Sequence, residues 1–392
     1  MRHTGSFMHQ CPLNSKRPRS RRDPTYIIQG QCDLCLLIHI CPTVPLRRET
    51  IAMRYTTLDF IIAQWSTQHP VVKADLAGKT VVVIGANTGL GFEASKHFAQ
   101  MNPGKLILGC RSESKGKEAV EKIKKDTGFS AELWLLDLAD FASVSAFADR
   151  FERDCGRLDI LVENAGVATD KYEVSKDGWE TSMQVNDLST PLLALRLLPL
   201  MVKTAQEHQT TPRLVIVASE VHYWTEISKE VAEDPSPLSV LGGAEFCSVP
   251  KQMADRYPLT KLLNVFFVRA FNDRLPPSTP VVIDTVNPGF CHSELSRNAV
   301  GLAGIMFAIM KFLIAHPTEV GSRQLVYAAL GEGNGDKLRG QFVTNYGVAE
   351  VSDFILTPMG VKLQDRLWDD LIDILKKVDS KVGDVVNSYL SS

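Results

Sequence analysis

The chain has 392 residues, of which 44% are apolar and 22% charged, and this composition is typical of a globular protein with a sizeable core. Its formal net charge of −2 gives no reason to expect nucleic acid as a partner. No stretch combines the length and composition of a signal peptide or a membrane-spanning helix. Nucleic-acid-binding and integral membrane proteins are therefore not expected.

Residues 1–52 differ in composition from the rest of the chain. They carry eight Lys/Arg against three Asp/Glu, a net charge of +5 that leaves −7 for the remainder. The pair Cys32-x-x-Cys35 suggests a zinc or redox site, but no second pair completes a ligand set, so we expect no metal. The basic, acid-poor start also resembles a transit peptide. Because a well-patterned segment opens at Met53, we favour an upstream extension with little structure.

Residues 53–78 are expected to form a short helix, Thr57–Gln68, and a linker. Thr80–Ile84 is then an unbroken apolar run rich in β-branched residues, which predicts a strand buried on both faces of a parallel sheet. A glycine-rich turn and an amphipathic helix to about Met101 follow. Glycines let the backbone approach a pyrophosphate, and a helix N-terminus favours its charge. We therefore predict a dinucleotide-binding turn at Gly85, Asn87, Thr88, Gly89, Leu90 and Gly91, spaced G-x-x-x-G-x-G.

The second strand, Leu106–Cys110, ends at Arg111. NAD-binding folds usually place an acidic residue here to hold the ribose 2′-hydroxyl, whereas an arginine suits the 2′-phosphate of NADP. The nearest acid is Glu113. We therefore expect NADP rather than NAD as the cofactor.

The alternation of strands and helices continues along the chain. Because ligands bind outside the carboxyl ends of parallel strands, we expect one crevice to collect the residues at those ends. They are Gly85, Arg111, Asp137 and Leu138 (placed to meet the adenine), Asn164-Ala165-Gly166, Ser219 and Asn287-Pro288-Gly289. The remaining elements expected are helix Glu113–Lys125, strand Glu132–Leu136, helix Phe141–Asp154, strand Leu158–Val162, a helical region from Trp179 to about Thr204, strand Arg213–Ala218, strand Val281–Val286, helix Thr318–Leu330, strand Gly340–Val343 and helix Leu363–Lys377.

Tyr257 and Lys261 lie four residues apart at the expected start of a helix that runs to about Asn272. This spacing puts both side chains on one helix face. Pro258 suits the first helical position, where no backbone N–H is needed. A nearby ammonium favours the phenolate and lowers the pKa of a tyrosine from its usual value of about 10. The pair is therefore a candidate general acid/base.

With these motifs the chain resembles a short-chain dehydrogenase/reductase over about residues 76–350, and within that family the retinol-dehydrogenase-like and fungal members. The supporting stretches are GANTGLG, Cys110-Arg111-Ser112 and VNPGFCHSEL. It departs from the family pattern at Ile84, Glu163 and Ala218, none of which is a catalytic group. The resemblance implies an α/β fold: one Rossmann-type, doubly wound parallel sheet with helices on both faces, spanning residues 79–350, with residues 351–392 as a helical segment packed on it.

The resemblance also implies roles for the site residues. Tyr257 would exchange a proton with the substrate oxygen, and Lys261 would lower the pKa of Tyr257 and hold the nicotinamide ribose. Ser219 would donate a hydrogen bond to the developing alkoxide. Asn186 would position water in a proton relay behind Lys261. Gly85 to Gly91, Arg111, Asp137, Leu138, Asn164 to Gly166, Pro288 and Gly289, with Tyr257 and Lys261, would bind NADP.

Two segments are expected to form the walls of the substrate site. Residues 220–256 make an unusually long connection beside Ser219, in which His222 is expected to be a hydrogen-bonded loop residue rather than an extra acid/base. Residues 290–316 include the strongly apolar Gly301–Ala315, which reads as a lid, a core helix or a membrane-surface contact. We favour the lid, and a bulky hydrophobic substrate that is retinoid-, steroid- or terpenoid-like; biosynthesis of specialised metabolites is one setting for it.

The predicted function is therefore interconversion of an alcohol and a carbonyl with NADP. Reduction of an activated C=C bond is an alternative for the same Tyr–Lys pair, and an NADP(H)-sensing regulator without turnover is another. We expect a cytoplasmic protein, with peripheral membrane contact and homo-oligomerisation left open. Helix Leu363–Lys377 would pack on the body or on a neighbouring subunit.

Overall fold

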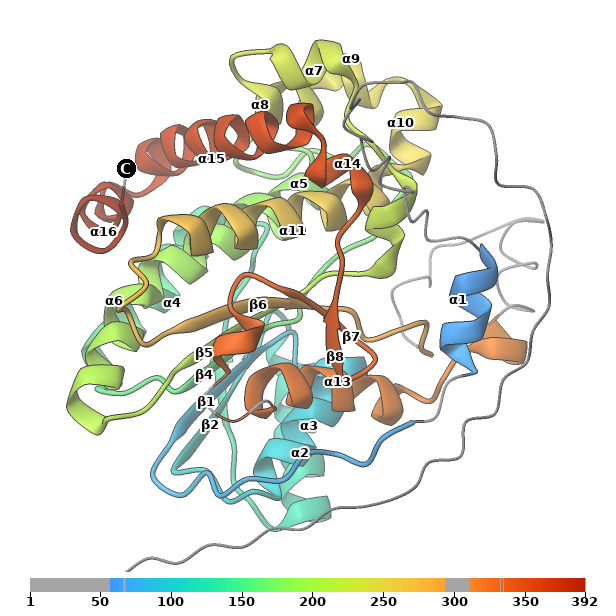
Figure 1. The fold of residues 1–392 in the computed structure, drawn as a ribbon. Coiled ribbons are helices and arrows are strands. Elements are labelled where there is room, and N and C mark those ends of the chain that lie inside the picture. Colours follow the sequence, from blue (N-terminus) through green and yellow to red (C-terminus); the bar gives the residue numbers. More distant parts are fainter. Residues whose placement is uncertain (1–56, 66–67, 293–310, 332, 334, 392) are drawn as a thin grey trace, which may run out of the picture. The chain divides into compact units, whose positions relative to one another are not determined.

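A computed structural model of the chain describes residues 57–65, 68–292, 311–331, 333 and 335–391 (Figure 1). The expected N-terminal extension, its cysteine pair and most of the apolar stretch 301–315 lie outside the described residues. The described residues all belong to one compact unit. They allow the expected α/β architecture to be examined element by element.

The described strands form one eight-stranded sheet in the order β3-β2-β1-β4-β5-β6-β7-β8. The strands run parallel except β8, which pairs antiparallel with β7. The chain builds outward from β1 in both directions, so the order reverses between β1 and β4, where such sheets bind ligands. The doubly wound sheet is confirmed, and β8 is an addition to the expected elements. The strands are β1 (Thr80–Ile84), β2 (Lys105–Cys110), β3 (Glu132–Leu135), β4 (Ile160–Glu163), β5 (Arg213–Val217), β6 (Val282–Val286), β7 (Phe342–Thr344) and β8 (Gly347–Ala349).

Helices cover both faces of the sheet, and each face has its own apolar core (Figure 1). One core lies beneath α2 (Gly89–Ala99), α3 (Glu113–Thr127) and α13 (Thr318–Leu330). The other lies beneath α4 (Phe141–Asp154), α6 (Thr190–His208) and α11 (Arg256–Arg274). Successive side chains of a strand alternate between these cores, so every residue of β1, β4, β5 and β6 is buried.

The helical region expected from Trp179 is interrupted by a π-helical segment. Its parts are α5 (Thr181–Met183), the π-helix η1 (Gln184–Ser189) and α6. Short π segments often occur at functional sites, and this one carries Asn186. The run Thr181–His208 is long and apolar enough to cross a membrane, but 94% of its apolar window is buried inside the protein. A core helix passes the same test, and this one packs against the sheet.

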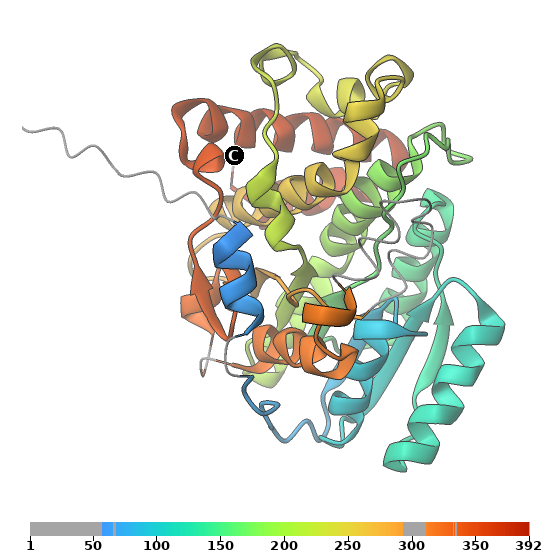
Figure 2. The same ribbon diagram turned by 90° about the vertical axis from the view of Figure 1, so that its right-hand side faces the viewer.

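Residues 220–256 are not the loop that the sequence predicted. They form the 3₁₀ helix η2 and four α-helices of four to six residues, which are too short to show a helical period in the sequence. Both views place α7 and α8 beside α15 (Pro358–Val378; Figures 1 and 2), and the Leu238 N–H donates to Asp370 of α15 over 2.8 Å. The elements are η2 (Glu220–Trp224), α7 (Lys229–Glu233), α8 (Pro237–Gly242), α9 (Ala244–Cys247) and α10 (Pro250–Ala254).

The C-terminal segment packs on the body of its own chain. Helix α15 (Pro358–Val378) starts five residues before the predicted helix, because Thr357 caps it through the Gly360 N–H. Trp368 of α15 stacks on Phe267 of α11, with ring centroids 6.1 Å apart. The buried Arg196 of α6 binds Asp149, Glu152 and Asp379. The other described helices are α1 (Thr57–Gln64), η4 (Asp336–Leu338), α14 (Asp353–Leu356) and α16 (Lys381–Tyr389).

Candidate active site

The glycine-rich turn after β1 packs against the turn after β4. Gly85 has a positive φ of 76°, and a Cβ there would lie 2.8 Å from the Cα of Ala165, so only glycine fits. Asn164 donates from Nδ2 to the Gly85 carbonyl over 3.0 Å. The predicted stretch Asn164-Ala165-Gly166 is therefore adjacent to the predicted dinucleotide-binding turn, as their positions at neighbouring strand ends required.

The N-terminus of α2 has the features of an anion site. Thr88 is its N-cap, but the Thr88 side chain makes no capping hydrogen bond, and no acidic residue lies in the first turn. The first N–H groups of Gly89 and Leu90 therefore keep the partial positive charge of a helix N-terminus. Asn87 and Leu90 are half-buried beside it. These residues fit the pyrophosphate of a dinucleotide.

Arg111 and Asp137 lie at the ends of β2 and β3, as predicted. Arg111 is exposed and has no ion-pair partner in the described part of the chain. Asp137 accepts a 3.0 Å hydrogen bond from the Ala139 N–H, which shapes the turn leading into α4, and Leu138 beside it is buried. Arg111 is thus available to a phosphate, whereas the Asp137 carboxylate is partly engaged within its own turn.

Asn186, Gly166 and Lys261 come together behind the crevice. A Cβ at Gly166 would lie 3.4 Å from Asn186 Oδ1 and 3.8 Å from Lys261 Nζ. The Asn186 amide exchanges two hydrogen bonds with Val167, at 3.0 and 2.9 Å, and donates a third to Thr260 Oγ1. The Asn186 side chain therefore joins the β4 turn to α11.

The Tyr257 phenol lies close enough to the Ser219 hydroxyl for that hydroxyl to affect its pKa. Burial raises the pKa of Tyr257, the Ser219 hydroxyl lowers it, and the Glu220 carboxylate raises it further. The net effect is a raised pKa, which favours the protonated phenol; the lowering of this pKa that was predicted from Lys261 is not among its causes. Helix α11 begins at Arg256, so Pro258 is its third residue rather than its first; it still lies in the first turn, where no N–H partner is needed.

Lys261 is buried one turn beyond Tyr257 on α11. Its ammonium donates to the carbonyl of Val217 over 2.6 Å and to Asn264 Oδ1 over 3.1 Å, and it lies 5.6 Å from the centre of the Tyr257 ring. Burial lowers the pKa of Lys261 to about 8, and the negative charge of Asp187 opposes that shift. Ser219, Tyr257 and Lys261, predicted from separate motifs, therefore occupy one site.

His222 supports the site through hydrogen bonds of both its ring nitrogens to the backbone. Its Nδ1 lies 2.8 Å from the carbonyl oxygen of Ser219, and its Nε2 accepts from the Ser352 N–H at 3.3 Å. Because Nε2 accepts, Nδ1 carries the proton and donates to Ser219. Burial lowers the pKa of His222 to about 4. The prediction of a hydrogen-bonded histidine agrees with this geometry.

The sequence analysis missed two residues of the site, Arg256 and Asn264. The fully buried Arg256 guanidinium lies 3.5 Å from a Glu180 oxygen and donates to the Leu241 carbonyl, so it ties the start of α11 to α8. Asn264 follows Lys261 by three residues on the same helix face. Helical spacing from Lys261 was the only available signal for Asn264. Arg256 gave none, because its charged partner Glu180 is distant in sequence.

The Pro288-Gly289 turn lies near the N-terminal helix α1. A Cβ at Gly289 would lie 3.7 Å from Gln64 Nε2, and the Phe60 ring of α1 contacts those of Trp224 and Phe290 at centroid distances of 5.8 and 6.0 Å. Figure 2 shows α1 (blue) beside this end of the sheet. The expected wall 290–316 lies mainly outside the described residues, but α1 contributes the buried Phe60 to an aromatic cluster with Trp224 and Phe290 that sequence analysis did not assign.

Comparison with known proteins identifies the family. A family model described as short chain dehydrogenase matches residues 79–223. The chain is 35% identical over 336 residues to the short chain dehydrogenase/reductase dmxR8 of a Cryptosporiopsis species, covering 85% of this chain and 100% of that protein. It is 32% identical to the short-chain dehydrogenase anuD of Penicillium roqueforti, covering 84% of this chain and 85% of that protein. Both relatives are fungal, as the sequence resemblance suggested.

Solved structures share the fold. An uncharacterized protein from Mycobacterium paratuberculosis is 25% identical, with a TM-score of 0.56 over 78% of this chain and 98% of that chain. An alcohol dehydrogenase from Thermococcus sibiricus, solved with 5-hydroxy-NADP, is 18% identical with a TM-score of 0.50 over 70% of this chain and 100% of that chain. The second likeness concerns the fold alone. From the family match and the fungal relatives together, the chain belongs to the short-chain dehydrogenase/reductase family of oxidoreductases.

Proposed function

We propose that this oxidoreductase interconverts an alcohol and a carbonyl group on a bulky hydrophobic substrate, with NADP(H) as cofactor. The observation that carries the proposal is the proximity of the Ser219 and Tyr257 hydroxyl groups, with the buried ammonium of Lys261 one turn further along α11. A proton donor, a second hydroxyl and a cation in one crevice are the groups that carbonyl reduction requires.

In the direction of reduction, Tyr257 is the acid. Burial keeps its phenol protonated, so it can give a proton to the substrate oxygen. The Ser219 hydroxyl donates a hydrogen bond to the same oxygen as negative charge develops there. The Lys261 ammonium then favours the phenolate that Tyr257 becomes, until a proton from solvent restores it. When bound, the nicotinamide supplies the hydride that reaches the carbonyl carbon.

The residues around the crevice support NADP rather than NAD. Arg111 is exposed at the end of β2 and has no carboxylate partner among the described residues, so its guanidinium is available for a 2′-phosphate. Thr88, Gly89 and Leu90 would hold the pyrophosphate at the N-terminus of α2. Lys261 would hold the nicotinamide ribose.

The aromatic surface beside Ser219 supports a bulky apolar substrate. Trp224, 46% exposed, ends the 3₁₀ turn that starts next to Ser219, and it contacts Phe60. Phe312 and Leu313, at the end of the apolar stretch, are 84% and 68% exposed. Apolar side chains exposed in this way suit a lid or a membrane-surface contact, and we keep the lid as the proposal.

The test is loss of NADPH absorbance by the purified full-length chain with a panel of bulky apolar aldehydes and ketones. We expect turnover with NADPH, slower turnover with NADH, and a loss of about 100- to 10,000-fold in Tyr257→Phe with NADPH binding retained. Tyr172→Phe, a change at an exposed tyrosine, is the matched control. Tight NADPH binding without turnover on any carbonyl would favour C=C reduction or a sensor instead.

A further inference from the structure

Asn264 links the site lysine to a buried carboxyl group. Lys261 Nζ donates to Asn264 Oδ1 over 3.1 Å. The Asn264 Nδ2 donates to the backbone carbonyl of Asn186 over 2.8 Å and to Asp187 Oδ1 over 3.2 Å. All four residues are at most 5% exposed. One amide therefore contacts the ammonium on one side and the π-helix η1 on the other.

The chemistry of the partners allows only one orientation of this amide. The Lys261 ammonium has donors and no acceptor, so it must face the amide oxygen of Asn264. The Asn186 carbonyl is an acceptor only, so it must face the amide nitrogen. The same nitrogen then reaches the Asp187 carboxyl. The positions of the oxygen and the nitrogen of the Asn264 amide are thus determined by its hydrogen-bond partners.

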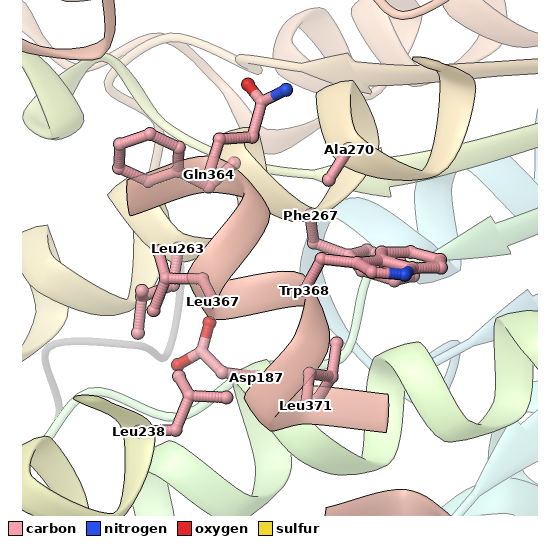
Figure 3. A pocket seen from close by; sticks show the side chains of 10 residues that line it. Asp187, Leu238, Leu263, Phe267, Ala270, Gln364, Leu367, Trp368 and Leu371 are labelled. Carbon is pink, nitrogen blue, oxygen red and sulfur yellow. The ribbon is translucent and has the colours of Figure 1, made fainter. Parts of the chain in front are cut away.

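The buried carboxylate of Asp187 requires a nearby cation to offset its charge. Figure 3 shows its carboxyl group among Leu238, Leu263 and Leu367, in the pocket between α11 and α15. Its Oδ2 has no hydrogen-bond partner among the residues that the structure describes. Burial raises the pKa of Asp187, while the charges of Lys261 and then Arg256 lower it and that of Glu180 raises it. Of these charged groups, only Lys261 is connected to Asp187 by described hydrogen bonds.

The buried ammonium of Lys261 in turn requires a nearby negative charge. Its two described acceptors, the Val217 carbonyl and the Asn264 amide oxygen, are both neutral. A buried ammonium that contacts only neutral groups is disfavoured unless a negative charge lies nearby. Among the residues that the structure describes, Asp187 is the one carboxylate whose charge favours the protonated form of Lys261. Arg256 also favours the ionised form of Asp187, but it is paired with Glu180 and no described hydrogen bond joins it to Asp187.

Building on the proposed function, we propose that Asn264 is a positioning residue: its amide fixes the Lys261 ammonium behind Tyr257 and couples it to Asp187, the counter-charge of that ammonium. Asn264 thereby also joins Lys261 to the Asn186 carbonyl. An amide holds its protons firmly at neutral pH. The role of Asn264 is therefore to hold and polarise Lys261 rather than to carry protons.

The direct test is the pKa of Lys261, measured by ¹³C NMR titration of ε-labelled lysine in the full-length protein. The Lys261 signal is assigned by its loss in Lys261→Met. The wild type should titrate at about 8. Asp187→Asn keeps the shape but removes the charge, and it should lower that pKa by about one unit. Asn264→Ala removes a hydrogen bond to the charged form and should also lower it.

A double variant tests the coupling itself. If the amide transmits the effect, Asp187→Asn combined with Asn264→Ala should lower the pKa by less than the sum of the single shifts. Asn272→Ala is the matched control, because it makes the same change on the same helix about 12 Å further along. It should leave the pKa unchanged. Thermal unfolding of each variant shows whether it is folded.

Turnover gives the second measurement. Asn264→Ala should lower kcat by about 10- to 100-fold with little change in the KM for the carbonyl, since a misplaced group costs rate more than binding. An unchanged Lys261 pKa in Asp187→Asn, or strictly additive shifts in the double variant, overturns the proposal. If the wild type turns over no carbonyl, the proposed function fails, and the NMR titration still decides whether Asp187 and Asn264 control Lys261.

Discussion

The ammonium of Lys261 donates a 2.6 Å hydrogen bond to the carbonyl of Val217, the last residue of β5. Ser219 follows Val217 by two residues, so this contact ties the helix that carries Tyr257 and Lys261 to the strand that presents Ser219. His222 holds the next part of the chain through the Ser219 carbonyl. The relative positions of the three proposed catalytic residues are thus determined by buried hydrogen bonds from both sides.

Ser219→Ala should lower kcat by about 100- to 1000-fold, because the substrate oxygen loses one of its two hydrogen-bond donors. Removal of the Ser219 hydroxyl also removes a group that lowers the pKa of Tyr257. The KM for the carbonyl should change much less than kcat. Steady-state kinetics with NADPH measure both, with Ser248→Ala at an exposed position as control. Equal losses in kcat for the two variants would contradict the role of Ser219.

Arg111→Asp should shift the cofactor preference toward NAD by about 10- to 100-fold, since a hydrogen bond to a charged group contributes about 1.5–3 kcal/mol. The ratio of kcat/KM for NADPH and NADH measures this preference. Lys115→Asp changes a nearby exposed cation on α3 and controls for general electrostatics. An NADPH/NADH ratio that is the same in Arg111→Asp and wild type would rule out Arg111 as the 2′-phosphate ligand.

His222 should make the fold sensitive to acid. Its pKa is about 4 in the folded protein against about 6.5 in the unfolded chain, so the unfolded state binds the proton first. Stability from this group is therefore present above pH 6.5 and is lost as the pH falls toward 4, by about 3 kcal/mol at the acid end. Protonation also removes the Nε2 acceptor of the Ser352 N–H.

Urea unfolding of wild type and His222→Gln at a series of pH values checks this prediction. The advantage of the wild type should shrink as the pH falls, and subtracting the two curves removes the effects of other groups. His208→Gln, at an exposed histidine, should keep the acid sensitivity of the wild type. A difference between wild type and His222→Gln that is constant from pH 7 to 4 would show that His222 does not titrate as argued.

Arg256→Met should lower the free energy of unfolding by about 3–5 kcal/mol, because it leaves the buried Glu180 without its cation. The Leu241 carbonyl also loses its donor. Combining Arg256→Met with Glu180→Gln should cost less than the two single changes added together. Urea unfolding midpoints measure all three. Additive costs would mean that the contact between Arg256 and Glu180 contributes nothing.

The sequence by itself determined the fold class and which strand ends meet at the candidate site. Apolar β-branched runs predicted the parallel strands, and parallel strands place their carboxyl ends at one edge, so Gly85, Asn164 and Ser219 had to meet there. The spacing of Tyr257 and Lys261 placed them on one helix face. These inferences succeeded because each depends on local periodicity and on a general rule of sheet geometry.

Only the tertiary structure decided which buried groups hold those residues in place. Asn264 is hydrogen-bonded to Asp187, 77 residues away in sequence, and Ser352 to His222, 130 residues away. No local pattern encodes such pairs. Residues 220–256 form short helices because tertiary contacts with α15 stabilise turns too short to be stable alone. Local patterns fix elements and their faces, whereas the partners of buried polar groups depend on which distant segments the packed core brings together.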